Sequence, residues 1–397
     1  MMRWMGLLCC LTLLFTFFPA AAEEAVVPEI TVGAKEIPDN DALRLIRDMK
    51  IGWNLGNTFD AIDCTWLSNK MDYESAWCGV KTSEALIEAL REAGFKTIRV
   101  PVSWHNHVDA DFTIDAEWLD RVQEVIDWVY DREMYVILNI HHDEEQFLPS
   151  EAHYEESARY IERIWSQLAE RFKEYDARLI MESMNEPRLL NSQHEWWWVA
   201  TEPDCMEAAD CLNRLNQLFV DTVRASGGNN AERYLMVPAY DANPQYACDA
   251  QFRLPEDTAD NKMIVSAHAY TPYNFALEMP GVASFDLDNA MQKAEIGGFM
   301  NQLYDTFVSK GIPVLIGEFG ALQKQDADGD HMQDRVDFTA YYIASARARG
   351  MTACWWDNHA FSGNGEKFGL IMHVGFSAVF LNLIKGRRLP RVCAPKA

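Results

Sequence analysis

Positive charge is scarce in this sequence. Its 397 residues include 35 lysines and arginines against 60 aspartates and glutamates, which gives a formal net charge of −25 at pH 7. Such a chain repels polyphosphate and anionic membrane surfaces. We therefore expect no nucleic-acid partner and favour a neutral one, such as a sugar.

Apolar runs long enough to span a membrane are absent. Arg3 precedes an apolar run from Trp4 to Phe18, and the small residues Ala20 to Ala22 follow. The run is shorter than the roughly 20 residues of a membrane-spanning helix, and its flanks are typical of an export signal. We predict that residues 1–22 are a signal peptide and that the protein is secreted or periplasmic, monomeric, and free of the membrane after cleavage.

The cysteines are few and lack metal-binding spacing. Nine cysteines minus Cys9 and Cys10 of the signal leaves seven (9 − 2), so at least one is unpaired in an oxidising compartment. Cys64 with Cys78, and Cys205 with Cys211, are close pairs in loop-like sequence, where we predict local disulfides, whereas Cys354 is expected to be a buried thiol. With no CxxC or Cys/His spacing, we expect no zinc, no other metal and no cofactor.

A linker rich in proline, serine or glycine is also missing, so we predict one domain over residues 41–397, preceded by a lead segment at 23–40. Short β-rich runs alternate with amphipathic helical stretches, which indicates a parallel sheet built from repeated βα units. Eight such runs favour a closed (β/α)8 TIM barrel, an α/β fold. They are Ile51–Asn57, Thr97–Val102, Tyr135–Ile140, Leu179–Glu186, Tyr234–Tyr240, Met263–Tyr270, Pro313–Gly320 and Thr352–Asn358.

Polar side chains recur where the predicted strands end, which is the active face of such a barrel. Each one alone has a structural explanation, such as a hydrogen bond to a nearby carbonyl group. Ionisable groups on six or more strands are harder to explain in that way, because unpaired charge is costly to bury. The set comprises Asn57, Arg99, His141, His142, Asn185, Glu186, Tyr240, His268, Tyr270, Glu318 and Trp356.

Two carboxylic acids stand out in this set. Glu186 and Glu318 end the predicted fourth and seventh strands, so barrel closure brings them across one opening. Glycoside cleavage needs one acid that protonates the leaving oxygen and one carboxylate on the other side of the sugar ring. A separation of roughly 5 Å implies retention of anomeric configuration, and roughly 6.5–9.5 Å implies inversion.

The neighbouring residues suggest different roles for the two acids. Asn185 is a candidate for binding the substrate's 2-hydroxyl, and Gly317 is expected to leave room for a sugar beside Glu318. We expect Arg99 and His141 or His142 to keep Glu318 ionised and oriented, with a hydrogen bond from Tyr270. A nearby negative charge is expected to raise the pKa of Glu186, which favours its protonated form.

Several motifs occur together and in order. They read GWNLGNTFD, TIRVPVSWHNHV, ILNIHHD, MESMNEP, HAYTPYNF, IGEFGA, WWDN and GEKFGL, between Ile51 and Ile371. In these motifs the sequence resembles glycoside hydrolase family 5, and most of all its subfamily 4 of endoglucanases and xyloglucanases. The resemblance implies a retaining endo-β-1,4-glucanase that acts on cellulose-type glucans, with xyloglucan and mixed-linkage β-glucan as further candidates.

The resemblance also assigns roles to residues. It implies that Glu186 is the acid/base and Glu318 the nucleophile. Asn57 and His142 match motif positions of less defined role, and Trp356 is the stacking platform, whereas Trp355 is expected to point towards the helices. The subsite of the attacked sugar is implied to contain Arg99, His141, Asn185, His268, Tyr270 and Trp356.

The chain departs from the family near its C-terminus. The segment from Ile371 to Ile384 is largely apolar, where the family has a polar loop and an amphipathic helix. The resemblance therefore leaves open whether this segment forms the eighth barrel helix.

Three alternatives remain open from the sequence. The first is another endo-acting β-glycanase of the same fold, such as a mannanase or xylanase. The second is a metal-dependent hydrolase using His141, His142, Asp143 and Glu144, although adjacent histidines on one strand point to opposite faces. The third is a non-catalytic glycan-binding barrel.

Overall fold

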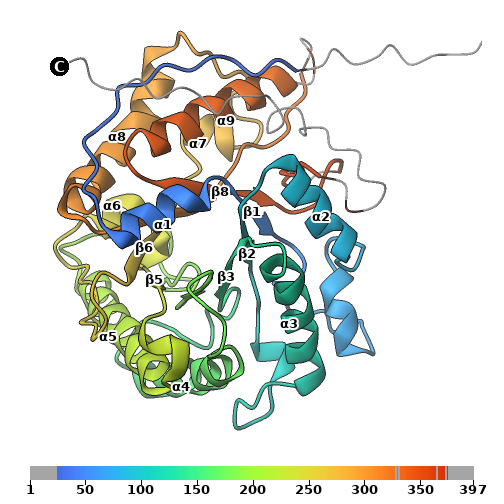
Figure 1. The fold of residues 1–397 in the computed structure, drawn as a ribbon, viewed down its shortest axis with the longest axis vertical. Coiled ribbons are helices and arrows are strands. Elements are labelled where there is room, and N and C mark those ends of the chain that lie inside the picture. The colour runs from blue at the N-terminus through green and yellow to red at the C-terminus, as the bar shows by residue number, and fades with distance from the viewer. Residues whose placement is uncertain (1–24, 327–328, 330, 364, 372, 374–397) are drawn as a thin grey trace, which may run out of the picture.

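The computed structural model describes residues 25–326, 329, 331–363, 365–371 and 373. Its strands form a closed parallel barrel in which each strand pairs with the next and the last pairs with the first (Figure 1). This confirms the predicted single-domain (β/α)8 fold, with shorter strands than expected. They are β1 (Gly52–Leu55), β2 (Thr97–Val100), β3 (Tyr135–Asn139), β4 (Leu179–Glu182), β5 (Leu235–Pro238), β6 (Met263–His268), β7 (Val314–Phe319) and β8 (Thr352–Asp357).

Helices surround the barrel, as the amphipathic patterns predict. Their ends follow local sequence signals: the Ser83 side chain caps the first turn of α2 by accepting a hydrogen bond from the Leu86 amide, and Gly94 ends the helix in the left-handed conformation. The helices of the ring are α2 (Glu84–Ala93), α3 (Ala116–Tyr130), α4 (Tyr154–Arg171), α5 (Pro203–Ala225), α6 (Pro244–Ala247), α7 (Tyr273–Ala276), α8 (Ala290–Thr306) and α9 (Met332–Arg347).

The barrel interior is packed with apolar side chains at its amino-terminal end. Helix α1 (Asp41–Met49) contributes Ala42, Leu45, Ile46 and Met49 to one buried cluster with inward-facing residues of the strands, which include Ile137, Ile180, Met236, Ile264 and Leu315. Figure 1 shows α1 across this end of the barrel. The carboxyl ends of the strands are therefore the end available for a site.

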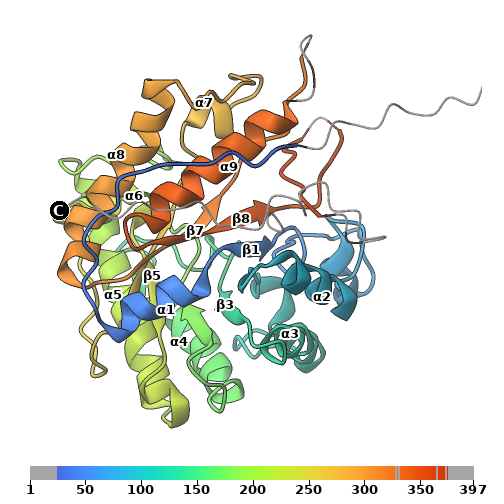
Figure 2. The same ribbon diagram turned by 45° about the horizontal axis from the view of Figure 1, so that its top comes forward.

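The lead segment before α1 belongs to the same folded unit. Figures 1 and 2 show it running beside α9. Ile30 packs against Ala340 and Ala344 of that helix, and the Lys35 amide donates a 2.7 Å hydrogen bond to the Ala348 carbonyl oxygen. The segment thus covers part of the outer face of α9.

The two predicted disulfides are wrong. Cys64, Cys78, Cys205 and Cys211 are all free thiols in buried positions. Cys205 and Cys211 both lie in α5, six residues and roughly 9 Å of helix rise apart, so their side chains cannot meet. The thiols of Cys64 and Cys78 donate instead to the carbonyl oxygens of nearby residues. Cys354 is a buried thiol, as expected.

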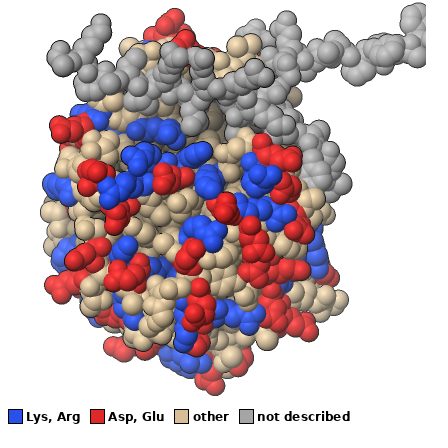
Figure 3. All heavy atoms as spheres, viewed as in Figure 1, with Lys and Arg blue, Asp and Glu red and all other residues tan. Residues whose placement is uncertain are grey.

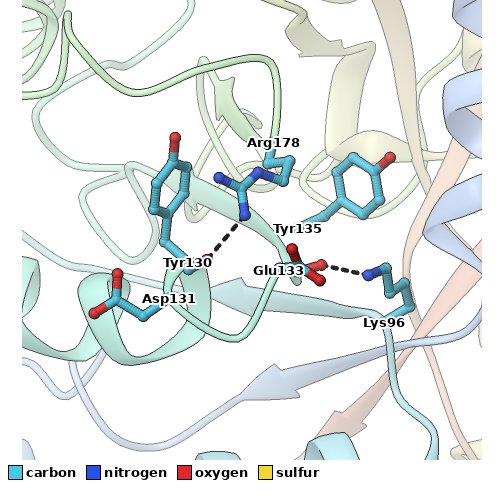
Figure 4. A pocket seen from close by; sticks show the side chains of 6 residues that line it. All are labelled: Lys96, Tyr130, Asp131, Glu133, Tyr135 and Arg178. Atoms are coloured by element: carbon cyan, nitrogen blue, oxygen red, sulfur yellow. Dashed lines mark hydrogen bonds between the residues drawn. The ribbon is translucent and has the colours of Figure 1, made fainter.

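The amino-terminal end of the barrel also has a pocket of about 450 Å³. Its lining is Lys96, Tyr130, Asp131, Glu133, Tyr135 and Arg178, where Arg178 donates to the Tyr130 carbonyl oxygen at 2.9 Å (Figure 4). Figure 3 shows basic and acidic side chains interspersed over the face seen in Figure 1. The pocket lies beside the starts of β2, β3 and β4, away from the predicted catalytic residues.

Two predictions concern membrane-spanning segments and the two ends of the chain. Among the described residues, no helix has the length and apolarity required to cross a bilayer. The predicted signal peptide and the apolar segment after Ile371 lie outside the described residues, apart from His373.

Candidate active site

Arg99 is the centre of the polar network at the carboxyl ends of the strands. It is fully buried on β2. Its Nη1 donates to Glu318 Oε1 at 2.8 Å and to Asn54 Oδ1 at 3.0 Å, and its Nη2 donates to Asn185 Oδ1 at 2.8 Å. Because a guanidinium group has five donors in a rigid fork, this one side chain fixes groups from β1, β7 and the loop after β4.

The two predicted catalytic carboxyl groups meet around His268. The His268 Nδ1 lies 2.7 Å from Glu186 Oε1 and 3.7 Å from Glu318 Oε1. One oxygen of Glu186 and one of Glu318 lie within 4.8 Å of each other. The Tyr270 hydroxyl donates to Glu318 Oε2 at 2.9 Å, as expected from the sequence. The Glu186 side chain is 22% exposed and that of Glu318 is 7% exposed, so the pair is open to solvent mainly through Glu186.

A β-bulge orients Glu318. The register of β7 shifts against both neighbouring strands, between Ala267 and His268 on one side and between Ile316 and Phe319 on the other. Leu315 faces the interior and Ile316 the helices, so regular alternation would turn Glu318 outward. The bulge redirects the side chain, which is a common device beside active sites.

Gly317 makes room for a side chain of the protein. A Cβ atom at this position would lie 2.8 Å from His268 Nε2. The missing side chain therefore makes room for His268 of the protein, which in turn reaches Glu186.

Glu182 is a functional residue that the sequence reasoning missed. It is fully buried on β4, accepts from Arg99 Nε at 2.7 Å and from the Ser266 hydroxyl at 2.6 Å. Glu182 and Glu318 together balance the positive charge of Arg99. The available signal was its spacing from Ile180, because residues two apart in a strand share one face, and that face is the barrel interior.

His141 lies beside Trp356, and His142 lies beside His141. In the described part of the chain, neither ring forms the predicted hydrogen bond or ion pair with Glu318. The His141 ring stacks on Trp356 with centroids 5.6 Å apart and hydrogen-bonds Asn139 at 3.1 Å. Burial, then the charges of His142 and Arg99, lower the pKa of His141 well below its ordinary value. Burial also opposes charge on His142, but Glu144 and Asp60 outweigh it and raise its pKa to about 9.

The remaining predicted residues are the tryptophans of β8 and two residues that follow β1 and β5. Trp356 is inward-facing and only 8% exposed, whereas Trp355 packs among the helices beside Phe319, as expected. Asn57 follows β1 with φ 56°, and its amide donates to Asp60. Tyr240 lies past the end of β5 and donates to the His194 carbonyl oxygen, so it anchors a loop.

The tryptophans of the loop after β4 differ in their exposure to solvent. Trp198 is buried, and its indole donates to the Cys205 carbonyl oxygen. Trp196 and Trp197 are 52% and 75% exposed, and Trp196 lies 4.3 Å from the Arg188 guanidinium. Arg188 in turn donates to the Glu186 carbonyl oxygen at 2.8 Å. Trp196 therefore lies on the side of the site that Glu186 occupies.

The expected direction of the Glu186 pKa is wrong for the unliganded protein. Burial raises it, but the hydrogen bond to His268 and the charges of His268, Arg188 and His142 outweigh burial and lower the pKa. The pKa of His268 is raised, because Glu318 and Glu186 outweigh the effect of its burial. Both pKa directions favour a charged imidazole hydrogen-bonded to an ionised Glu186.

The residues proposed for a metal-dependent hydrolase are engaged in other ways. β3 ends at Asn139, so strand alternation does not separate His141 from His142, whose rings lie 4.4 Å apart. Both share a cluster with Asp60, but the Asp60 carboxylate accepts the amides of Asn57 and Thr58. Asp143 accepts from the Trp104 amide and the Tyr160 hydroxyl. These donors fit a hydrogen-bonded network better than a metal site.

A closed (β/α)8 barrel with two close carboxyl groups, a buried arginine and an inward tryptophan at its carboxyl end defines a glycoside hydrolase. Comparison with known proteins makes this specific. The family model described as Cellulase (glycosyl hydrolase family 5) matches residues 59–362. The chain belongs to this family.

Individual relatives agree with that assignment. Endoglucanase 1 of Ruminococcus albus is 39% identical over 373 residues, which cover 92% of this chain and 86% of the relative. A family 5 lichenase from Caldicellulosiruptor sp. F32, solved as a variant with cellotetraose, has a TM-score of 0.89 and 49% identity, and covers 92% of this chain and 100% of its own.

A subfamily 4 broad-specificity endoglucanase from Ruminococcus champanellensis with bound cellotriose has a TM-score of 0.80 and 40% identity, with coverage of 88% of this chain and 99% of its own. The predicted resemblance to this subfamily is thereby confirmed. The enzyme class predicted from the sequence, a cellulase-type endo-β-1,4-glucanase, is confirmed as well.

Proposed function

We propose that this protein is a retaining enzyme that cuts internal β-1,4 bonds of cellulose-type and mixed-linkage β-glucans, with Glu318 as nucleophile and Glu186 as acid/base. The separation of the carboxyl groups is the main support, because two of their oxygens lie within 4.8 Å of each other. Retaining glycosidases hold these groups roughly 5–5.5 Å apart, whereas inverting enzymes leave space for a water molecule.

In the first step, a Glu318 oxygen bonds to the anomeric carbon while the bond to the leaving oxygen breaks. The proton of Glu186 moves to that oxygen. Glu318 loses its negative charge in this step, and the donors Arg99 and Tyr270 hold its two oxygens in the attacking orientation. In the second step, Glu186 takes a proton from water, which attacks the same carbon and releases Glu318.

The hydrogen-bonded pair of Glu186 and His268 can supply the proton that this reaction needs. The state with a charged His268 and an ionised Glu186 has the same net charge as the state with a neutral His268 and a protonated Glu186. A sugar that displaces water from the site disfavours separated charges, since burial penalises the ionised forms. Substrate binding therefore favours the form that Glu186 needs as an acid.

The remaining site residues are proposed to bind sugar. Trp356 offers an aromatic face, and Asn185 has its oxygen bound to Arg99, which leaves its amide hydrogens for the 2-hydroxyl of the attacked sugar. His141, beside Trp356, and Asn57 and His142 at the rim complete this subsite. The wide range of the subfamily 4 relatives, one of which is named a broad-specificity endoglucanase, supports xyloglucan as a further substrate.

We also propose that the protein is exported by residues 1–22 and acts as a monomer outside the cytoplasm. The Arg3 and apolar pattern at the N-terminus supports export. N-terminal sequencing of the secreted protein tests this: a mature start near Glu23 supports it, and a retained Met1 contradicts it.

The catalytic assignment is tested with Glu186→Gln on two substrates. The variant should lose at least 10³-fold in kcat/KM on barley β-glucan, whose leaving group needs a proton. It should retain formation of the glycosyl-enzyme with 2,4-dinitrophenyl β-cellobioside, whose leaving group is stable as an anion. Equal losses on both substrates, or full activity on β-glucan, would contradict the role of Glu186 as the acid.

Substrate choice is tested with the wild-type enzyme on matched soluble polysaccharides. Barley β-glucan and carboxymethylcellulose should be cut far faster than glucomannan or xylan. A preference for mannan or xylan would favour the other β-glycanases of this fold.

A further inference from the structure

Asn54 is a buried polar residue close to the nucleophile that the mechanism above does not use. It lies on β1 between Trp53 and Leu55, whose side chains pack into the core shared with the surrounding helices. Because side chains alternate along a strand, Asn54 faces the barrel interior. The residue is fully buried, so its polar atoms require hydrogen-bond partners.

The side-chain oxygen of Asn54 binds the arginine of the site. Its Oδ1 accepts a 3.0 Å hydrogen bond from Arg99 Nη1, and the same nitrogen donates to Glu318 Oε1 at 2.8 Å. Arg99 also donates to Glu182 and Asn185. Loss of the Asn54 oxygen alone therefore leaves the arginine held by its other partners.

The side-chain nitrogen of Asn54 reaches the peptide bond before the nucleophile. Its Nδ2 donates to the Gly317 carbonyl oxygen at 2.9 Å, and at longer distances to the carbonyl oxygens of Trp355 (3.2 Å) and Cys354 (3.3 Å). The barrel places β8 between β1 and β7. The hydrogen bond to Gly317 thus joins two strands that are not neighbours.

The Gly317 carbonyl group lies in the bulge that orients Glu318. In the register of β7 against β8, Gly317 and Glu318 together lie opposite the single residue Cys354. A bulge of this kind interrupts the ladder of backbone hydrogen bonds. The Asn54 amide supplies a hydrogen bond to the bulge from the barrel interior, at the residue directly before the nucleophile. The direction of the Glu318 side chain therefore depends on a side chain of β1.

The nucleophile is thus held both at its carboxylate and at its backbone. Arg99 and Tyr270 donate to the two carboxylate oxygens. From β6, the Ala269 amide donates to the Glu318 carbonyl oxygen at 3.0 Å, and from β1 Asn54 binds the preceding carbonyl oxygen. A displacement of about 1 Å at a reacting group can cost on the order of 100-fold in rate, because attack needs aligned atoms.

We propose that Asn54 is a positioning residue for the nucleophile: its side-chain amide holds the bulge of β7 from the barrel interior and so directs Glu318 at the anomeric carbon. Asn54 acts through Gly317 and Arg99 and contacts no substrate. The step that it affects is the attack of a Glu318 oxygen on the anomeric carbon, in which the leaving group departs with the electrons of the broken bond. The inference rests on the proposed role of Glu318.

The experiment measures covalent labelling by 2,4-dinitrophenyl 2-deoxy-2-fluoro-β-cellobioside at saturating concentration. A Glu318 oxygen bonds to the sugar and dinitrophenolate leaves, so its absorbance gives the rate, and intact mass gives the number of labels per protein. This leaving group needs no proton, so the role of Glu186 does not enter. In Asn54→Ser the labelling rate should fall about 100-fold, whereas the final label should still approach one per protein.

Asn230→Ser is the matched control. Asn230 is also fully buried, its Oδ1 accepts from Arg233, and its Nδ2 donates to the Ala169 carbonyl oxygen at 2.7 Å. It lies before β5, at the end of the barrel opposite the site. Asn230→Ser removes comparable hydrogen bonds and should label at the rate of the wild type.

A loss of folded protein and a misplaced nucleophile give different results. If Asn54→Ser only unfolds part of the protein, the folded part labels at the wild-type rate and the final number of labels falls. That result, or a labelling rate within about threefold of the wild type, would overturn the proposal.

Asn54→Asp separates the two ends of the amide. The aspartate keeps an acceptor for Arg99 but lacks the donor for the Gly317 carbonyl oxygen, so this variant should label as slowly as Asn54→Ser or more slowly. Labelling of Asn54→Asp at the wild-type rate would also overturn the proposal, because the contact with the bulge would then be unnecessary.

The same labelling distinguishes this proposal from the role of Glu318 itself. If the wild-type enzyme is labelled at Glu318 and Asn54→Ser reacts at the same rate, only the role of Asn54 is wrong. If the label on the wild type lies on another residue, the proposed nucleophile is wrong.

Discussion

His268 lies between the two carboxyl groups of the site, with Nδ1 2.7 Å from Glu186 Oε1 and 3.7 Å from Glu318 Oε1. On its other side, Nε2 lies 3.5 Å from Arg99 Nη2. One imidazole therefore connects the acid/base, the nucleophile and the arginine that binds it. Its position depends on Gly317, where any Cβ atom would collide with the ring.

His268→Asn should reduce kcat/KM by about 10- to 100-fold, because Glu186 loses the group that orients it. The hydrogen bond from His268 lowers the pKa of Glu186, so its removal raises that pKa and moves the alkaline limb to higher pH. A pH profile of kcat/KM checks it, with the exposed His153→Asn as control; a limb that moves towards acid would contradict the assignment.

Trp355 and Trp356 form a matched pair on one strand. Trp356→Ala should raise KM on β-glucan at least tenfold, with a small change in the thermal midpoint, because this ring faces the site. Trp355→Ala should instead lower the free energy of unfolding by about 3–5 kcal/mol, since it removes a buried indole from the helix layer. Kinetics and urea unfolding of both variants distinguish the roles, and equal effects in both assays would refute the division.

Arg233 is a structural arginine far from the chemistry. It is 1% exposed, and its guanidinium donates to the carbonyl oxygens of Phe172, Tyr175, Asp176 and Leu179, which join the end of α4 to the start of β4. Arg233→Met should cost about 3 kcal/mol or more, because these acceptors lose their donor. Chemical denaturation measures the loss. Arg253→Met, at an exposed position, should be neutral, and kcat at 25 °C should stay within about twofold for both.

Stability should fall as pH rises through the titration of His142. Its pKa is raised to about 9 in the folded protein, so its ion pairs with Glu144 and Asp60 contribute fully below about pH 6.5 and are lost as pH approaches 9. The contribution is on the order of 2–3 kcal/mol. Unfolding free energies at pH 6 and pH 9 should differ less in His142→Gln than in the wild type. An unchanged pH dependence in that variant would show that His142 is neutral.

The barrel and most of its site were predictable from the sequence because two regular patterns carry the information. Apolar runs with helical stretches between them indicate the strands, and parallel strands bring their carboxyl ends together. Arg99, Glu186, His268, Tyr270, Glu318 and Trp356 could therefore be assigned to one site from their positions alone.

What could not be predicted depends on contacts between distant residues or on irregular backbone. The bulge in β7 orients Glu318 against the alternation of its strand. The spacing of Glu182 from Ile180 indicates only that it faces the barrel interior, and its role follows from its contact with Arg99. The direction of the Glu186 pKa depends on His268, 82 residues away. The Cys205–Cys211 disulfide failed because both residues lie in helix α5, although the sequence around them is loop-like.

The central claim is that Glu318 bonds to the sugar during turnover, and covalent trapping tests it most directly. A 2-deoxy-2-fluoro β-cellobioside with an activated leaving group slows both steps, and the second more, so the glycosyl-enzyme accumulates. Mass spectrometry of the digested protein should find the fluorinated disaccharide on the peptide that contains Glu318, and Glu318→Gln should remain unlabelled. A label on another carboxylate such as Glu182, or cleavage that releases the α-anomer first without any covalent adduct, would contradict the account.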